Sequence, residues 1–128
     1  MTTTVAENVS QAEKNESFSR AIAVPKTLPE RCTDWEVISL FYSALHYVDA
    51  FLVSVHGVPA GSHKHRNFFV GTTRDFNTIA IRYKDLYQRS REARYDLVPM
   101  APEFMDKLEL EAFRPIRAHM RALLNLPG

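Results

Sequence analysis

The sequence is poor in the residues that form cross-links and tight backbone turns. Its 128 residues include one cysteine and four glycines. Cys32 alone permits no internal disulfide, which fits a reducing compartment. With so few glycines the chain has no phosphate-cradling loop, and it carries no Walker-type, Gly-x-Ser-x-Gly or His-Glu-x-x-His motif. The sequence therefore excludes disulfide-stapled folds and predicts no cofactor.

Strand-like alternation, internal repeats and low-complexity runs are also absent. The start, MTTTVAENVSQAEKNES, lacks the basic residues and apolar run of a secretory signal. The longest apolar stretch, 34–56, holds too many Asp, Glu, His and Ser residues for a membrane span. The length and the 45% hydrophobic content are those of one globular domain over 1–128. We expect a cytoplasmic protein that does not enter a membrane.

Segment 34–56 predicts a helix at the centre of a bundle. It contains no Pro or Gly, and its apolar residues recur at three- and four-residue steps and spread onto the flanks. A helix of this kind is covered on most sides. We expect Thr33 or Asp34 to cap its start and Gly57 to end it.

Helical patterns of the same kind fill most of the remaining chain. After a flexible tail over 1–8, the expected helices span 9–24, 34–56, a short 63–70 capped by Ser62, a segment from Thr72 or Thr73 to Ser90 or Tyr95, and a segment that begins near Pro102. Pro25 stops the first of them. The apolar period of the last one continues across Pro115, which predicts one kinked helix. The fold class is an all-α, up-down helical bundle of four long helices and one short helix.

Charge is uneven although the net charge is only +1. Segment 62–95 carries eight Lys and Arg against three Asp and Glu, whereas 1–61 carries four against seven. A basic middle segment suits an anionic partner such as a phosphate or a nucleic-acid backbone. The alternative is an ordinary solvated helix face.

Tyrosine, histidine and arginine recur at helical spacing on three of the expected helices. We expect them to meet at one end of the bundle, because residues three, four and seven apart share a face. The candidate ligand-binding residues are Tyr42, His46, Asp49, His63, Arg66, Tyr87, Arg91, Arg94 and Tyr95. Arginine forks match phosphate oxygens, and tyrosine donates a hydrogen bond or stacks on a base. The alternative is that these are interior groups with structural partners, for example Asp49 paired with Arg91 or Arg94.

No metal site is predicted. His63 and His65 are two residues apart, so they point to different sides of a helix, and no third ligand lies near them in the sequence.

Three blocks of the chain resemble the HEPN family of bacterial helical-bundle domains, and more narrowly its uncharacterised members. They are DWEVISLFYSALHYVDAFL, SHKHR and YKDLYQRSREARYDL, in that order, and the likeness covers most of residues 10–98. The resemblance implies an all-α domain that forms a homodimer, binds nucleotides or RNA, and acts in toxin–antitoxin or defence systems, often beside a nucleotidyltransferase partner.

The resemblance also indicates which residues a catalytic member would use. Active HEPN proteins are metal-independent ribonucleases with an Arg-x4–6-His motif composed across a dimer, and Arg114 and His119 have that spacing. His119 would then act as general acid or base. Three functions remain open: a non-catalytic nucleotide- or RNA-binding module, which we favour; a ribonuclease that uses Arg114 and His119; and a purely structural bundle for dimerisation or partner binding.

Overall fold

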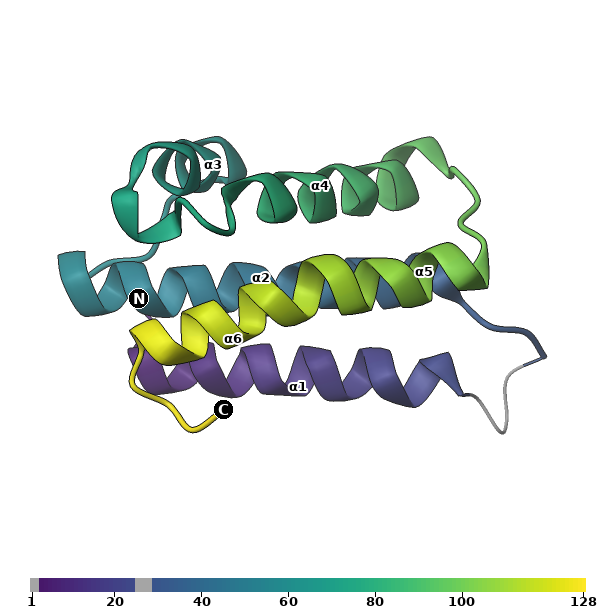
Figure 1. Ribbon diagram of the computed structural model, residues 1–128, viewed down its shortest axis with the longest axis horizontal. Helices are drawn as coiled ribbons and strands as arrows, with labels where there is room; N and C mark the ends of the chain where they lie inside the picture. Colours follow the sequence, from purple (N-terminus) through teal and green to yellow (C-terminus); the bar gives the residue numbers. More distant parts are fainter. Residues whose placement is uncertain (1–2, 25–28) are drawn as a thin grey trace.

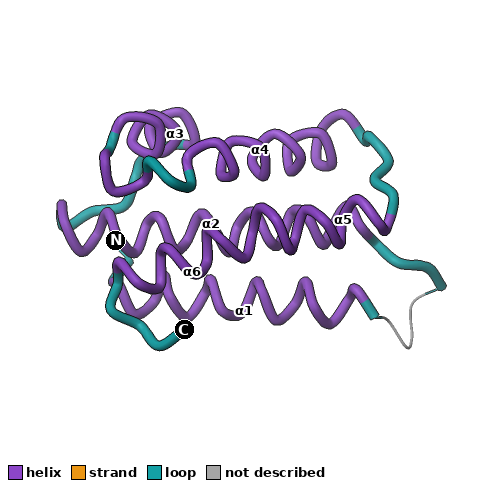
Figure 2. Tube along the Cα trace, in the orientation of Figure 1, coloured by secondary structure: helices purple, strands orange, loops and turns teal. Residues whose placement is uncertain are grey.

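The computed structural model describes residues 3–24 and 29–128, and all regular structure in these residues is helical (Figure 2). The helices are α1 (Val5–Ala23), α2 (Thr33–His56), α3 (His63–Thr72), α4 (Ala80–Arg91), α5 (Pro102–Leu108) and α6 (Arg114–Leu123). In Figure 1, α1, α2, α4 and the joined α5 and α6 run lengthwise, and α3 lies beside the start of α4. The all-α prediction is confirmed for these residues.

α2 is the central helix, as its apolar pattern predicts. It packs against α1, α4, α5 and α6, and Phe41 and Tyr47 are fully buried within it. By length and composition, α2 is the one helix in 3–24 and 29–128 that could also cross a membrane. Most of its apolar stretch is covered by the rest of the bundle, so packing inside this domain accounts for its composition.

α1 starts earlier than the sequence analysis expects. The Thr4 hydroxyl accepts a hydrogen bond from the Glu7 N–H (3.0 Å), and the Glu7 carboxylate accepts one from the Thr4 N–H (2.9 Å). This reciprocal capping box satisfies two N–H groups at the helix start. The prediction of a tail up to residue 8 is therefore wrong for residues 5–8. Residues 1 and 2 of that tail, and Pro25, lie outside the described residues.

The end of α2 and the start of α3 are predicted correctly, but the cap at the start of α2 is not. Gly57 ends α2 with φ of 82°, a left-handed conformation that glycine adopts without strain. The Ser62 hydroxyl caps α3 by accepting from the His65 N–H (3.1 Å). Neither Thr33 nor Asp34 caps α2, which follows Cys32 and has no side-chain cap. Thr33 instead donates its hydroxyl to the Met100 carbonyl (2.8 Å), so it joins the start of α2 to the loop that precedes α5.

The segment after α3 is more broken than the expected single helix. α3 continues through Gly71 to Thr72, and a short 3₁₀ turn, Arg74–Phe76, precedes α4. Thr73 stands before this turn without a side-chain cap. α4 then passes into a π-helical turn, Glu92–Asp96, which ends in a left-handed residue, Leu97 (φ 52°).

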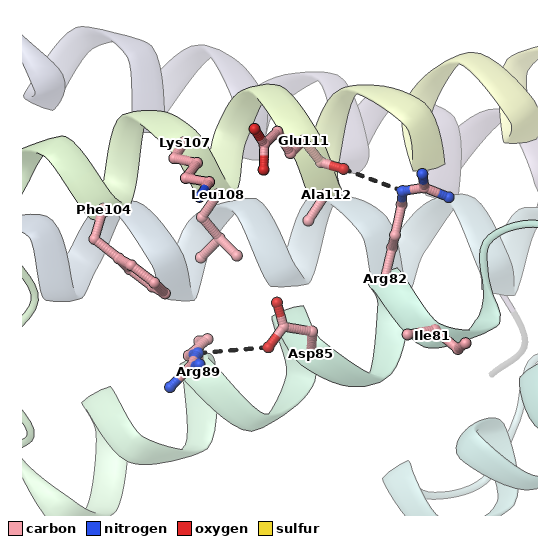
Figure 3. Close-up of a pocket in the computed structure, with 9 residues that line it drawn as sticks. All are labelled: Ile81, Arg82, Asp85, Arg89, Phe104, Lys107, Leu108, Glu111 and Ala112. Atoms are coloured by element: carbon pink, nitrogen blue, oxygen red, sulfur yellow. Dashed lines mark hydrogen bonds and ion pairs between the residues drawn. The ribbon is translucent and has the colours of Figure 1, made fainter.

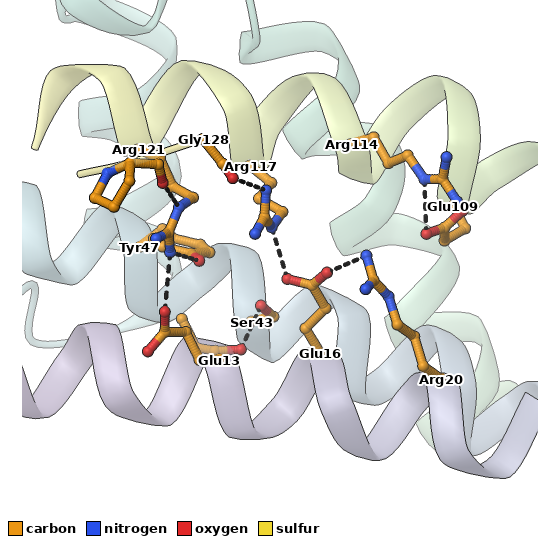
Figure 4. A network of polar contacts seen from close by, with 12 residues as sticks. Glu13, Glu16, Arg20, Ser43, Tyr47, Glu109, Arg114, Arg117, Arg121 and Gly128 are labelled. Atoms are coloured by element: carbon orange, nitrogen blue, oxygen red, sulfur yellow. Dashed lines mark hydrogen bonds and ion pairs between the residues drawn. The ribbon is translucent and has the colours of Figure 1, made fainter. Parts of the chain in front are cut away.

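α1 is attached to the bundle mainly by polar contacts, which Figure 4 shows. The Ser43 hydroxyl donates to the Ala12 carbonyl (2.7 Å). Arg117 on α6 pairs with Glu16 (2.8 Å), which also pairs with Arg20. The α1 residues that become buried are Asn8, Ala12, Glu16 and Ser19. Only one of these four is apolar, so α1 has a weaker hydrophobic anchor than α2.

α5, the π-helical turn Glu109–Phe113 and α6 form one continuous helix across Pro115, as predicted. Proline has no N–H and cannot bond to the Glu111 carbonyl four residues earlier. The Arg82 side chain on α4 donates Nε to that carbonyl instead (3.1 Å) and a terminal N–H to the Thr78 carbonyl (3.1 Å). A distant side chain thus replaces the hydrogen bond that the proline removes.

The Arg82 contact predicts a coupling between two distant positions. Arg82→Ala should lower the free energy of unfolding by about 1 kcal/mol, the usual loss for one hydrogen bond. In a Pro115→Ala background the loss should be smaller, because alanine restores a backbone N–H that can reach Glu111. Urea unfolding of the two single variants and the double variant measures the coupling. Strictly additive losses would contradict the replacement of one bond by the other.

Candidate functional site

A buried ion pair joins α2 to α3 beneath the candidate site. Arg66 donates Nε and Nη2 to the two carboxylate oxygens of Asp49 at 2.9 and 3.0 Å. Both residues are almost fully buried, at 7% and 5% exposure. The third guanidinium nitrogen of Arg66, Nη1, lies 3.5 Å from Nδ1 of the His63 ring. The alternative that Asp49 has an interior structural partner is therefore confirmed, but that partner is Arg66 and not Arg91 or Arg94.

An aromatic layer lies beside this ion pair. The rings of Tyr42, His63 and Tyr87 each lie 5.3–5.8 Å from the ring of buried Phe41. His63 also lies 5.6 Å from Tyr87. The three outer rings come from α2, α3 and α4 and are partly exposed. Three helices that are separate in the sequence therefore contribute to one aromatic surface.

Arg94 extends this surface with a guanidinium group. Its Nη1 donates to the Tyr42 hydroxyl (2.7 Å), and its Nε donates to the Ser90 carbonyl (3.3 Å). The guanidinium carbon lies 5.5 Å from the ring centre of Tyr42 and 5.0 Å from that of Tyr95. Among residues 3–24 and 29–128, Arg94 forms no ion pair with a carboxylate. We call Tyr42, His63, Tyr87, Arg94 and Tyr95 the Arg94 patch.

The other expected ligand-binding residues lie around the patch. Asp49 and Arg66 form its buried support. His46 is partly buried, and its ring Nδ1 lies 3.0 Å from the Asn8 side-chain oxygen, so it is tied to α1. Arg91 is exposed and close enough to influence the His63 pKa. The patch is thus a partly exposed surface with a buried base.

Tyr83 belongs to the same region and was not predicted. It is fully buried on α4, one turn before Tyr87, and its ring lies 5.7 Å from Phe41. Its hydroxyl has no hydrogen-bond partner among the described residues. Burial raises its pKa above the ordinary value of 10.0, so the hydroxyl stays neutral. In the sequence, the four-residue spacing between Tyr83 and Tyr87 already indicates that both lie on the same face of a helix.

Arg114 and His119 do not lie together. Arg114 is exposed, and its Nε donates to Glu109 (3.0 Å), toward the side of α6 that faces α1 (Figure 4). The His119 ring contacts the other side of the bundle, where Nε2 lies 2.6 Å from the Asp75 carbonyl and Nδ1 3.4 Å from the Thr78 hydroxyl. Within one chain they therefore do not form a shared catalytic group.

No group of three or more His, Cys, Asp or Glu side chains suited to a metal ion occurs within the described residues. No family model, no curated protein and no solved structure matches this chain. What the Arg94 patch can bind is therefore inferred from its contacts and charges.

The two histidines next to the ion pair have lowered pKa values. Burial is the main cause for both His46 and His63, and the Arg66 charge lowers both further. Each imidazole therefore binds a proton more weakly in the folded chain than in the unfolded chain. The resulting loss of stability is absent above the ordinary pKa of 6.5 and grows as the pH falls below it.

Acidification should therefore destabilise the fold partly through these two rings. Between about pH 7.5 and pH 5.5, the free energy of unfolding should fall less in His63→Gln and His46→Gln than in the original chain, because glutamine does not titrate in this range. Chemical unfolding at both pH values measures this. His119→Gln is the control, and equal losses in all four proteins would contradict the assignment.

The contacts of His119 predict a structural role. His119→Ala should lower the free energy of unfolding by about 1 kcal/mol, because it removes the contact to the Asp75 carbonyl. Incubation with RNA should show no cleavage that depends on His119. RNA cleavage by the original chain that disappears in both His119→Ala and Arg114→Ala would instead establish the ribonuclease.

Proposed function

We propose that this chain is a HEPN-like helical module that binds a nucleotide or a short RNA segment at the Arg94 patch, without catalysing a reaction. The observation that carries this proposal is the state of Arg94. Its guanidinium group is held by Tyr42 and lies against Tyr95, yet it has no carboxylate partner among the described residues. An oriented and unneutralised guanidinium is suited to a phosphate.

The aromatic rings around Arg94 favour a ligand that carries both phosphate and base. Tyr95 is 67% exposed, and Tyr42, His63 and Tyr87 are partly exposed. Exposed rings next to an arginine provide stacking surfaces for bases, while the guanidinium binds the phosphate. A small inorganic anion would use only the second of these features. The patch therefore fits a nucleotide better than free phosphate.

His63 can take part in binding as a neutral imidazole. Its pKa is lowered by burial and by the charges of Arg66 and Arg94, so it is neutral near pH 7. A neutral imidazole can accept or donate one hydrogen bond to a base or a ribose. No second histidine or carboxylate in the Arg94 patch supplies the complementary proton donor or acceptor that hydrolysis needs.

The cellular part of the proposal comes from the sequence resemblance. A HEPN-like module of this kind would act as a cytoplasmic homodimer within a toxin–antitoxin or defence system. A nucleotidyltransferase is the partner class that the resemblance implies. Its products carry nucleotidyl groups, which are the chemistry that the Arg94 patch suits.

Binding should depend on Arg94 and on the Tyr42 hydroxyl that orients it. Isothermal titration with AMP, ATP and short single-stranded RNAs should show saturable binding to the original chain. Arg94→Gln should weaken it about tenfold or more, because a charge-assisted hydrogen bond contributes roughly 1.5–3 kcal/mol. Tyr42→Phe should give a smaller loss, because the charge stays but its orientation relaxes.

Arg74→Gln is the matched control, since Arg74 is an exposed arginine outside the patch. It should bind like the original chain. Circular dichroism and unfolding curves must first show that Arg94→Gln is folded. The proposal is wrong if no nucleotide or RNA binds at millimolar concentration, or if Arg74→Gln and Arg94→Gln weaken binding equally.

A further inference from the structure

The Arg94 patch has a second arginine at its edge. Arg91, the last residue of α4, lies one turn after Tyr87, so both are on the same face of the helix. Burial is the main cause of the lowered pKa of His63, and the Arg91 charge lowers it further, after those of Arg66 and Arg94. Because His63 and Tyr87 both belong to the patch, Arg91 lies next to it.

The charges around the patch do not cancel. Asp49 and Arg66 neutralise each other in the buried pair at 2.9 Å. Arg91 and Arg94 remain, and neither forms an ion pair among the described residues. α3 contains no carboxylate. Asp96, at the end of the π-helical turn, is exposed and pairs with neither arginine. Two arginines without a carboxylate partner therefore lie beside the same aromatic rings.

Arg89, which is also near the end of α4, shows the contrast. It faces a hollow of about 400 Å³ between α4 and α5, where it pairs with Asp85 at 3.4 Å (Figure 3). It also pairs with Glu92 at 3.2 Å. The charge of Arg89 is thus neutralised within the protein. Arg91 and Arg94 have no such partners, so their charge is available to an anion.

Both of these arginines have N–H groups left for a ligand. A guanidinium group has five N–H donors. Arg94 uses one for the Ser90 carbonyl and one for the Tyr42 hydroxyl, which leaves three. Arg91 is exposed and donates to no group among the described residues. The two side chains can therefore bind several oxygens of one anion.

We propose that the Arg94 patch binds a phosphate monoester, the terminal phosphate of a nucleotide or of an RNA end, with Arg94 and Arg91 on its oxygens. A phosphate monoester carries about −1.5 to −2 charges at pH 7 and three acceptor oxygens, whereas a phosphate inside a strand carries about one charge. Two unneutralised arginines match the monoester better. The inference rests on the proposed function, because it names the part of the ligand that the same patch binds.

The pair 5′-AMP and 3′,5′-cyclic AMP tests this preference, because the two share base and ribose and differ in phosphate charge. In isothermal titration of the full chain, 5′-AMP should bind about fivefold more tightly than cyclic AMP, the range of one exposed charge contact. Adenosine should bind more weakly than either. Equal affinity of all three would overturn the inference.

Arg91→Gln assigns the preference to the second arginine. It should bring the affinity for 5′-AMP close to that for cyclic AMP, whereas Arg94→Gln should weaken both nucleotides. Arg91 is exposed, so the fold should be unchanged, and circular dichroism checks this. Arg74→Gln, outside the patch, should keep the fivefold ratio. A preference for 5′-AMP that survives Arg91→Gln would overturn the role of Arg91.

A short RNA with a 5′-phosphate, compared with the same RNA with a 5′-hydroxyl, distinguishes the two sources of the monoester. A similar preference for the phosphorylated RNA indicates an RNA end, and a preference seen only with 5′-AMP indicates a free nucleotide. Equal binding of 5′-AMP and cyclic AMP that is lost in Arg94→Gln would overturn this inference and leave the proposed function standing. No binding of any probe would overturn both.

Discussion

The buried pair of Asp49 and Arg66 determines how α3 lies against α2. Two buried charges are tolerated only when each satisfies the other and the remaining N–H groups find acceptors. Arg66 meets this requirement through both Asp49 oxygens and the nearby Ala60 carbonyl. These bonds fix the rotation of α3, and with it the position of His63 against Phe41. The aromatic surface depends on that rotation.

The charged residues of α4 and its π-helical turn divide into two sets with different consequences. Arg89 has two carboxylate partners, Asp85 and Glu92, on the side that faces α5. Arg94 has neither, and its neighbours are rings and a hydroxyl. Arg89 therefore stabilises α4 and the turn after it through its ion pairs. Arg94 keeps a charge that can bind an anion. Arg94 is thus a positive charge on the aromatic side that no carboxylate among the described residues neutralises.

The fold was largely predictable because apolar periodicity reports which face of each helix is buried. The continuous helix across Pro115 follows from that period alone. The Arg82 contact to Glu111 could not be predicted, because it depends on how α4 lies beside α5. The start of α1 is a different case. Thr4 and Glu7 have the spacing of a capping box, and this local signal outweighs the polar composition that indicated a tail.

Spacing along a helix identifies residues on one face, but it does not specify which face of the next helix they meet. Tyr42, His46 and Asp49 were correctly placed on one side of α2, yet the partner of Asp49 could be decided only by the packing of α3. Arg114 and His119 are five residues apart, which turns them about 140° from each other on a helix. Asp49 pairs with Arg66, whereas Arg94 bonds to the Tyr42 hydroxyl and has no carboxylate partner among the described residues. That choice of partner is what makes the patch a candidate for binding an anion.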